Sequence, residues 1–309
     1  MRAIVAKLVQ AFALAALLAM TTWAHSRVGV LGEAVEGKSF LPRPEFVRSA
    51  SFGFTSLAAD YYWLETVQLV GAATHADPAA FAEQIGQLLD IVTQLDPWVD
   101  HPYRFGAVWM IDCERSVRHA DDLLRRGIAY HPTDWRDRFY LGFNQFYYLE
   151  QNEAAANTLE AATRYPGAPL HLSRLVARLR AGSDGLESAA IFLEELVRRA
   201  PDGRARAEYE KALDEVETER RARFLDQARA EYVRLHGKDI TSPEDLLAGE
   251  NPVLRQLPAE PNGWEWTLNE RGEIVSTYYG SRYVVHRDPI DEQRRARWRA
   301  ERESAETRK

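Results

Sequence analysis

The side chains best suited to covalent or metal chemistry are few and scattered along this 309-residue chain. Cys113 is the single cysteine, which excludes an intrachain disulfide and a multi-cysteine zinc site. A nucleophilic cysteine needs a neighbouring base, and the sequence identifies none for Cys113. His119 and Asp122 can share one face of a helix as a metal pair, but a solvated or capping histidine is the simpler interpretation of this spacing. These residues predict a buried thiol and an ordinary histidine.

Motifs that bind nucleotides or activate water are also missing from the sequence. It contains no Gly-rich phosphate loop, no Gly-x-Ser-x-Gly and no His-x-x-x-His pair. The net charge of -7 leaves no basic surplus to hold a nucleic acid. We therefore expect a non-enzymatic protein with no catalytic residue, no metal, no cofactor and no nucleic-acid partner.

Binding chemistry is better represented than catalysis. Arg136, Phe139, Phe143 and Tyr147 follow one another at spacings of three and four, so they can share one face of a helix. Arginine and aromatic side chains dominate binding energy when an interface desolvates them. Aromatic residues at helical spacing are also typical of a core, so the pattern alone leaves both interpretations open.

The elements that position these residues follow an internal period. Prolines close successive helical segments at intervals of 34 or 35 residues, at Pro97, Pro132, Pro166 and Pro201. Proline cannot continue a helix and disfavours helical geometry in the residue before it, so each proline ends a unit at the same place. Small residues recur 12 positions before the last three of these prolines, at Ala120, Ala154 and Ala189. A small side chain there allows two helices to approach closely.

This pattern resembles the tetratricopeptide repeat (TPR) family, whose helix-turn-helix unit is 34 residues long and ends with a proline. The best match is residues 135–166, where Leu141-Gly142 fits the leucine-glycine pair and Ala154 and Ala161 fit the two small positions. The resemblance implies an all-α helical-repeat solenoid over residues 56–236. A bundle of helices with prolines evenly placed by chance is the alternative.

The resemblance also implies a binding groove. In TPR proteins the first helix of each unit lines a concave surface that holds a protein or peptide partner. The groove-facing places of the best unit hold Arg136, Phe139, Phe143 and Tyr147 in this sequence. Arg104 and Arg180 occupy comparable places in the preceding and following units. We expect these six residues to form the partner-binding groove.

The N-terminus predicts export. Arg2 and Lys7 precede an uncharged apolar run of 17 residues from Leu8 to Ala24, the layout of a secretory signal and near the lower limit of a membrane span. We therefore expect residues 1–24 to be a cleaved signal peptide or a signal anchor that contacts the membrane through residues 3–24. The first outcome places the protein in the bacterial periplasm, the second in the inner membrane with a single pass and a periplasmic domain. Residues 25–55, rich in Gly, Ser and Pro, predict an extended tether.

The flanks of the repeats are predicted from the same periodicities. Residues 56–71 predict a helix whose apolar stripe is Leu57, Tyr61, Leu64 and Val67. Residues 201–236 predict one long helix that caps the solenoid. Residues 237–286 predict a short helix and a small β-hairpin appendage of strands 264–268 and 274–279, with 283–285 as a candidate third strand. Residues 287–309 predict a charged tail, either a frayed helix or disordered.

Together these features predict a scaffold that binds proteins in the bacterial cell envelope and assists the assembly of a surface or secretion apparatus. The alternative is an envelope enzyme whose site lies between the solenoid groove and the C-terminal aromatic sheet.

Overall fold

The computed structural model describes residues 12, 14–23, 41–71, 77–183, 185–200, 203–249, 251–284 and 289–306. Its contacts divide the chain into two units, Met1–Pro42 and Arg43–Lys309. In the first unit, residues 12 and 14–23 are helical, and their large apolar side chains are exposed. Within the described parts of the chain, no helix combines the length and apolar character needed to cross a membrane. Much of the predicted signal or anchor, residues 1–24, lies outside those parts.

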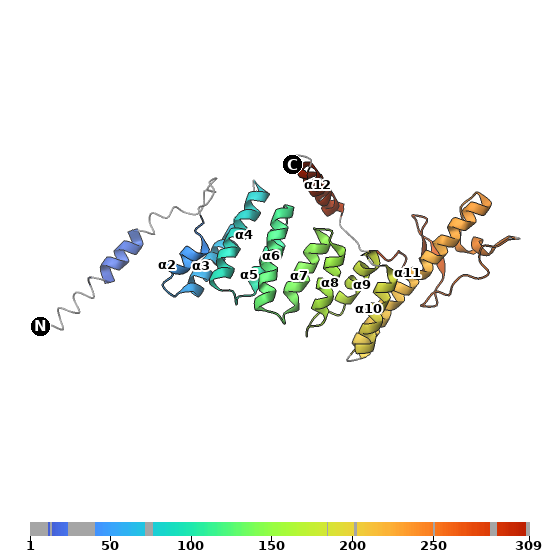
Figure 1. Ribbon diagram of the computed structural model, residues 1–309, viewed down its shortest axis with the longest axis horizontal. Helices are drawn as coiled ribbons and strands as arrows, with labels where there is room; N and C mark the ends of the chain where they lie inside the picture. The colour runs from blue at the N-terminus through green and yellow to red at the C-terminus, as the bar shows by residue number, and fades with distance from the viewer. Residues whose placement is uncertain are drawn as a thin grey trace. The chain divides into compact units, whose positions relative to one another are not determined.

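The second unit is predominantly helical and carries one small antiparallel sheet (Figure 1). Its elements in chain order are α2 (Pro44–Ala50), α3 (Thr55–Gly71), α4 (Pro78–Leu95), α5 (His101–Trp109), α6 (Glu114–Tyr130), α7 (Trp135–Tyr147), α8 (Asn152–Thr163), α9 (Leu172–Ser183), α10 (Leu186–Arg199), α11 (Gly203–His236), the 3-10 helix η1 (Pro243–Leu247), β1 (Trp266–Leu268), β2 (Ile274–Ser276) and α12 (Pro289–Glu306). From α3 to α11, each helix contacts the next one along the chain. In addition, α4 contacts α6 and α5 contacts α7, so neighbouring helix pairs pack together.

The helix ends follow the prolines. Helices α4, α6, α8 and α10 end just before Pro97, Pro132, Pro166 and Pro201. Side-chain caps mark two of the helix starts: Asp77 accepts hydrogen bonds from the amides of Ala79 and Ala80, and Asp134 accepts one from Arg136. The helix boundaries predicted from the proline period are confirmed.

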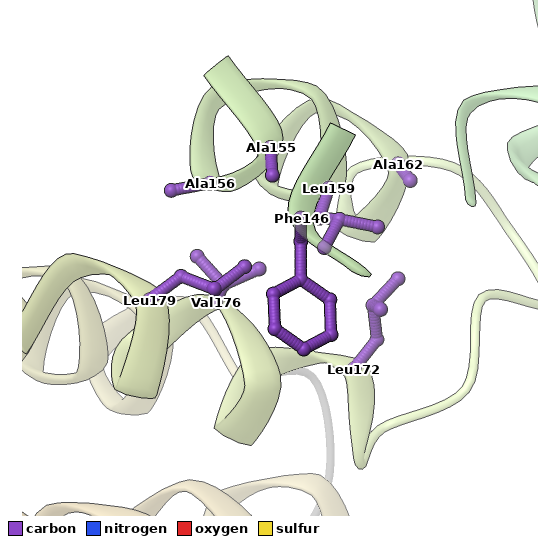
Figure 2. Close-up of a cluster of buried hydrophobic side chains, with 8 residues drawn as sticks. All are labelled: Phe146, Ala155, Ala156, Leu159, Ala162, Leu172, Val176 and Leu179. Carbon is purple, nitrogen blue, oxygen red and sulfur yellow. The ribbon is translucent and has the colours of Figure 1, made fainter. Parts of the chain in front are cut away.

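A buried cluster joins α7, α8 and α9. Its members, shown in Figure 2, are Phe146, Ala155, Ala156, Leu159, Ala162, Leu172, Val176 and Leu179. Gly142 on α7 allows α8 to approach α7 closely, because a Cβ atom at this position would lie only 2.5 Å from Cγ of Leu159. The predicted small positions are displaced by one residue, since Ala155 and Ala162 are buried whereas Ala154 and Ala161 are only half-buried.

The C-terminal appendage packs on α11. Strand β1 pairs antiparallel with β2, with Trp266 opposite Ser276. Trp266 and Ile274 join a buried cluster with Leu225 and Tyr232 of α11. The predicted hairpin and long helix are confirmed, while Tyr283 and Val284 are not in a strand.

The structure differs from the sequence predictions at three places in this unit. Residues 44–50 form α2, with Val47 buried, where an extended tether was expected. The predicted apolar stripe of α3 is exposed, and Ala59, Trp63, Thr66 and Val70 on the other side face the core instead. Residues 289–306 form α12, a helix as in one of the two predicted alternatives, but this helix packs against the rest of the unit through Trp298 and is not merely a charged tail.

Candidate protein-binding surface

The aromatic residues predicted for the groove lie side by side on α7. The rings of Phe143 and Tyr147 stack with centroids 4.9 Å apart, and Phe139 lies 6.3 Å from Phe143. All three side chains are half-buried and pack against the buried cluster of α7, α8 and α9. The row therefore supports the core and also presents an aromatic edge outside it, which combines the two interpretations that the sequence left open.

The arginines predicted for the same groove differ in their surroundings. Arg136 is half exposed, lies over the ring of Trp135 and pairs with Asp134 at 3.3 Å. Arg104 on α5 is largely buried and forms a bridge to α7, donating from Nη2 to Asp134 at 2.7 Å and from Nε to Asp137 at 2.8 Å. Burial raises the pKa of Asp137, and the guanidinium of Arg104 opposes that rise. Arg104 thus holds two helices together.

Arg180 on α9 lies apart from the aromatic row. It donates to Asn157 at 3.2 Å and pairs with Glu160, both on α8. Together with Glu160 it lines a broad cleft of about 990 Å³ between the end of α8, the chain that follows it, and α10. The apolar and aromatic lining of the cleft includes Ile191, Phe192 and Tyr209.

Helix α12 contacts the end of the aromatic row. Nη1 of Arg295 donates to the carbonyl oxygen of Tyr147 at 2.7 Å, and its guanidinium carbon lies 5.3 Å from the centre of the Tyr147 ring. The Arg295 side chain is 1% exposed. Three residues on, Trp298 is buried against Val117 of α6 and Leu149. This contact was not predicted from the sequence, where one tryptophan in a charged segment is its only signal.

A second polar cluster joins α11 to the appendage, beside the C-terminal sheet that the alternative enzyme site was expected to include. Glu219 accepts hydrogen bonds from Arg282 and Arg223, and these oppose burial and hold the pKa of Glu219 below its usual range. Glu260 accepts from the amide of Trp264 and from Asn262 and Ser276, and these hydrogen bonds likewise outweigh burial and lower its pKa. The cavity beside Glu219 is about 40 Å³, room for a water molecule but not for a substrate. Glu219 is paired with two arginines and Glu260 is hydrogen-bonded to neutral donors, and these contacts join α11 to the appendage.

The candidate metal and nucleophile residues have ordinary partners. Nε2 of His119 lies 2.8 Å from Asp90, and the sulfur of Cys113 lies 3.1 Å from the hydroxyl of Ser116. No group of three or more His, Cys, Asp or Glu residues in the described chain could hold a metal ion.

No family model, curated protein or solved structure matches this chain. Its function is therefore inferred from its own surfaces, in particular the α7 face, formed by Phe139, Phe143 and Tyr147, and helix α12 packed at the end of this face.

Proposed function

We propose that the protein is a non-enzymatic scaffold of the bacterial cell envelope that binds a helical segment of a partner protein on the α7 face. The observation that carries this proposal is that the end of this face already holds a helix, α12, through Arg295 and Trp298. A surface that buries an arginine and a tryptophan of one helix has the chemistry to accept another helix of the same kind.

The proposed architecture is a TPR-like solenoid over residues 56–236. The near-constant interval between the helix-ending prolines and the packing of each helix on the next support it. In such an array the aromatic row of α7 belongs to the groove. Arg136 is an exposed cation at that groove, while Arg104 holds α5 against α7 through its ion pairs with Asp134 and Asp137.

The proposed location follows from the N-terminus. The uncharged run from Leu8 to Ala24 either anchors the protein in the inner membrane or directs it to the periplasm. A scaffold in this place serves the assembly of a surface or secretion apparatus, whose components must be held close to the membrane as they are joined.

The α7 face can be tested by photo-crosslinking in the native host. p-Benzoylphenylalanine replaces Phe143 in one variant and Phe224, an exposed phenylalanine of α11, in a matched control. We expect a partner adduct at position 143 that is absent at position 224. The adduct should increase in an Arg295→Ala/Trp298→Ala background, because α12 no longer covers the end of the row. Identical adducts at both positions, or no intermolecular adduct in either background, would contradict the proposal.

A further inference from the structure

Helix α3 is apolar on two faces, and only one of them is covered. Ala59, Trp63, Thr66 and Val70 face the core, where Trp63 and Val70 pack against a cluster that includes residues of α4 and α5. The other face carries the stripe Leu57, Tyr61, Leu64 and Val67, all exposed, with Leu57 at 68%. Asp60 and Gln68 are also exposed on this side, beside the stripe. An apolar stripe on a helix normally packs against another apolar surface, and the described chain supplies none for this one.

The segment before α3 extends the same apolar surface. Its exposed aromatic residues are Phe46 of α2 and Phe52 and Phe54 of the α2–α3 turn. Phe52 is 90% exposed and has a φ of 49°, a left-handed conformation that is costly for a bulky side chain. In water, the backbone strain at Phe52 and the exposure of its ring both cost free energy. Insertion of the ring into an apolar phase would offset this cost.

The chain itself indicates which apolar phase that is. In the sequence, this surface follows the uncharged apolar run from Leu8 to Ala24, and residues 25–42 lie between the two. If that run is in a bilayer, a linker of this length holds the α2–α3 surface near the lipid at a millimolar effective concentration, so weak affinity suffices. Phenylalanine, tyrosine and leucine are also the residue types that enter the interfacial layer of a membrane. Arg43, exposed at the start of α2, flanks the surface and can face anionic headgroups, whereas Arg48 donates to the carbonyl oxygen of Gln94 on α4.

We infer that the apolar face of α2 and α3, formed by Phe46, Phe52, Phe54, Leu57, Tyr61, Leu64 and Val67, docks into the lipid–water interface of the membrane. The inference rests on the membrane placement proposed above. It adds that the folded unit lies against the bilayer through its N-terminal helices and does not hang free on a tether.

The test uses the full chain reconstituted into vesicles of phosphatidylcholine and phosphatidylglycerol. The native thiol is removed by Cys113→Ser, and one environment-sensitive fluorophore is attached to a new cysteine in each of three variants. Leu57→Cys reports on the α3 face, Leu17→Cys on the apolar run, and Phe224→Cys on an exposed control site of α11. Each label is quenched in turn by nitroxide-bearing lipid and by iodide in the water.

We expect the label at position 57 to be quenched at least threefold more by nitroxide lipid than the label at position 224, and to be protected from iodide. The same label should regain iodide quenching in a Leu64→Glu/Val67→Glu variant whose helical content is unchanged. Quenching by iodide alone at position 57 would overturn the inference, since the face would lie in water. Protection from both quenchers would also overturn it, because another protein surface would then cover the face.

The label at position 17 separates this inference from the proposed anchor. Nitroxide quenching at 17 without quenching at 57 leaves the anchor intact and refutes the docking of α3. Absence of lipid quenching at 17 refutes the anchor, and the label at 57 then decides the docking of α3 by itself.

Discussion

Arg104 shows how a charged residue suited to binding can instead be part of the framework. Its guanidinium contacts Asp100, Asp134 and Asp137, and the last of these is 0% exposed. Removing one member of a buried ion pair leaves the other charge unpaired in a poorly solvated site. Arg136, whose pair with Asp134 is exposed to solvent, lacks that role.

Arg104→Met should therefore lower the free energy of unfolding by about 3 kcal/mol, since Asp137 loses its counter-charge. The matched change Arg136→Met removes a solvent-exposed pair and should cost less than about 0.5 kcal/mol. Urea unfolding at pH 7, followed by circular dichroism, measures both. Equal losses for the two variants would show that Arg104 does not bridge α5 and α7 as described.

Asp121 is a buried carboxyl between α6 and α7. Burial raises the pKa of Asp121 to about 6, although the hydrogen bond from Asn144, 2.9 Å long, partly opposes the shift. Between about pH 4 and pH 6, Asp121 is therefore still protonated in the folded protein, whereas in the unfolded chain, where its pKa is about 4, it has already lost its proton. It follows that stability falls as pH rises from about 4 to about 6 and stays lower above that range.

Asp121→Asn should remove this pH dependence, because the amide keeps an oxygen for Asn144 and carries no charge. At pH 7 the variant should gain up to about 3 kcal/mol, and at pH 4 it should match the parent protein. Asp122→Asn is the control, since Asp122 is exposed. Urea midpoints at both pH values check the prediction, and a gain at pH 4 as large as that at pH 7 would refute the titration of Asp121.

At the scale of elements, the sequence predicted what depends on local rules and missed what depends on partners. Prolines end helices through their own geometry, so the boundaries at Pro97 and Pro132 were predictable. Which face of α3 is buried could not be decided, because both faces carry apolar residues and only the packing against α4 and α5 distinguishes them. The row of Phe139, Phe143 and Tyr147 was predicted from spacing, but its half-burial depends on packing against other helices.

Gly142 gives a test of the close packing between α7 and α8. A methyl group at this position would lie 2.5 Å from Cγ of Leu159, so Gly142→Ala should cost about 1–3 kcal/mol by overpacking. Gly182 on α9 has no neighbouring atom within 4 Å of such a methyl group. Gly182→Ala should therefore stabilise the protein by about 0.5–1 kcal/mol through helix propensity and chain entropy.

Thermal unfolding of the two alanine variants measures this contrast. Because the substitution is the same, any general effect of alanine on helices cancels in the comparison. A neutral or stabilising shift for Gly142→Ala would mean that α8 does not approach α7 as closely as the structure shows.

At the scale of the whole chain, α12 connects the C-terminus to helices far earlier in the sequence. The segment 289–306 is strongly charged, and most of that charge is compatible with a solvated tail. Three side chains change this outcome: Arg295 binds the carbonyl of Tyr147, Trp298 is buried beside Val117, and Arg299 pairs with Glu150 at 3.3 Å. Composition alone could not indicate this contact, since it depends on a few positions of α12 and on the residues of other helices that they meet.

The attachment of α12 can be measured by hydrogen exchange. In Arg295→Ala/Trp298→Ala, α12 loses its buried tryptophan and its bond to Tyr147, so amides of residues 289–306 should exchange at least about tenfold faster. Residues 147–150 should also lose protection, because Arg295 and Trp298 cover this stretch. Arg297→Ala, an exposed change on the same helix, should alter neither segment. If the double variant exchanged like the parent, these two side chains would not be what holds α12 against α7.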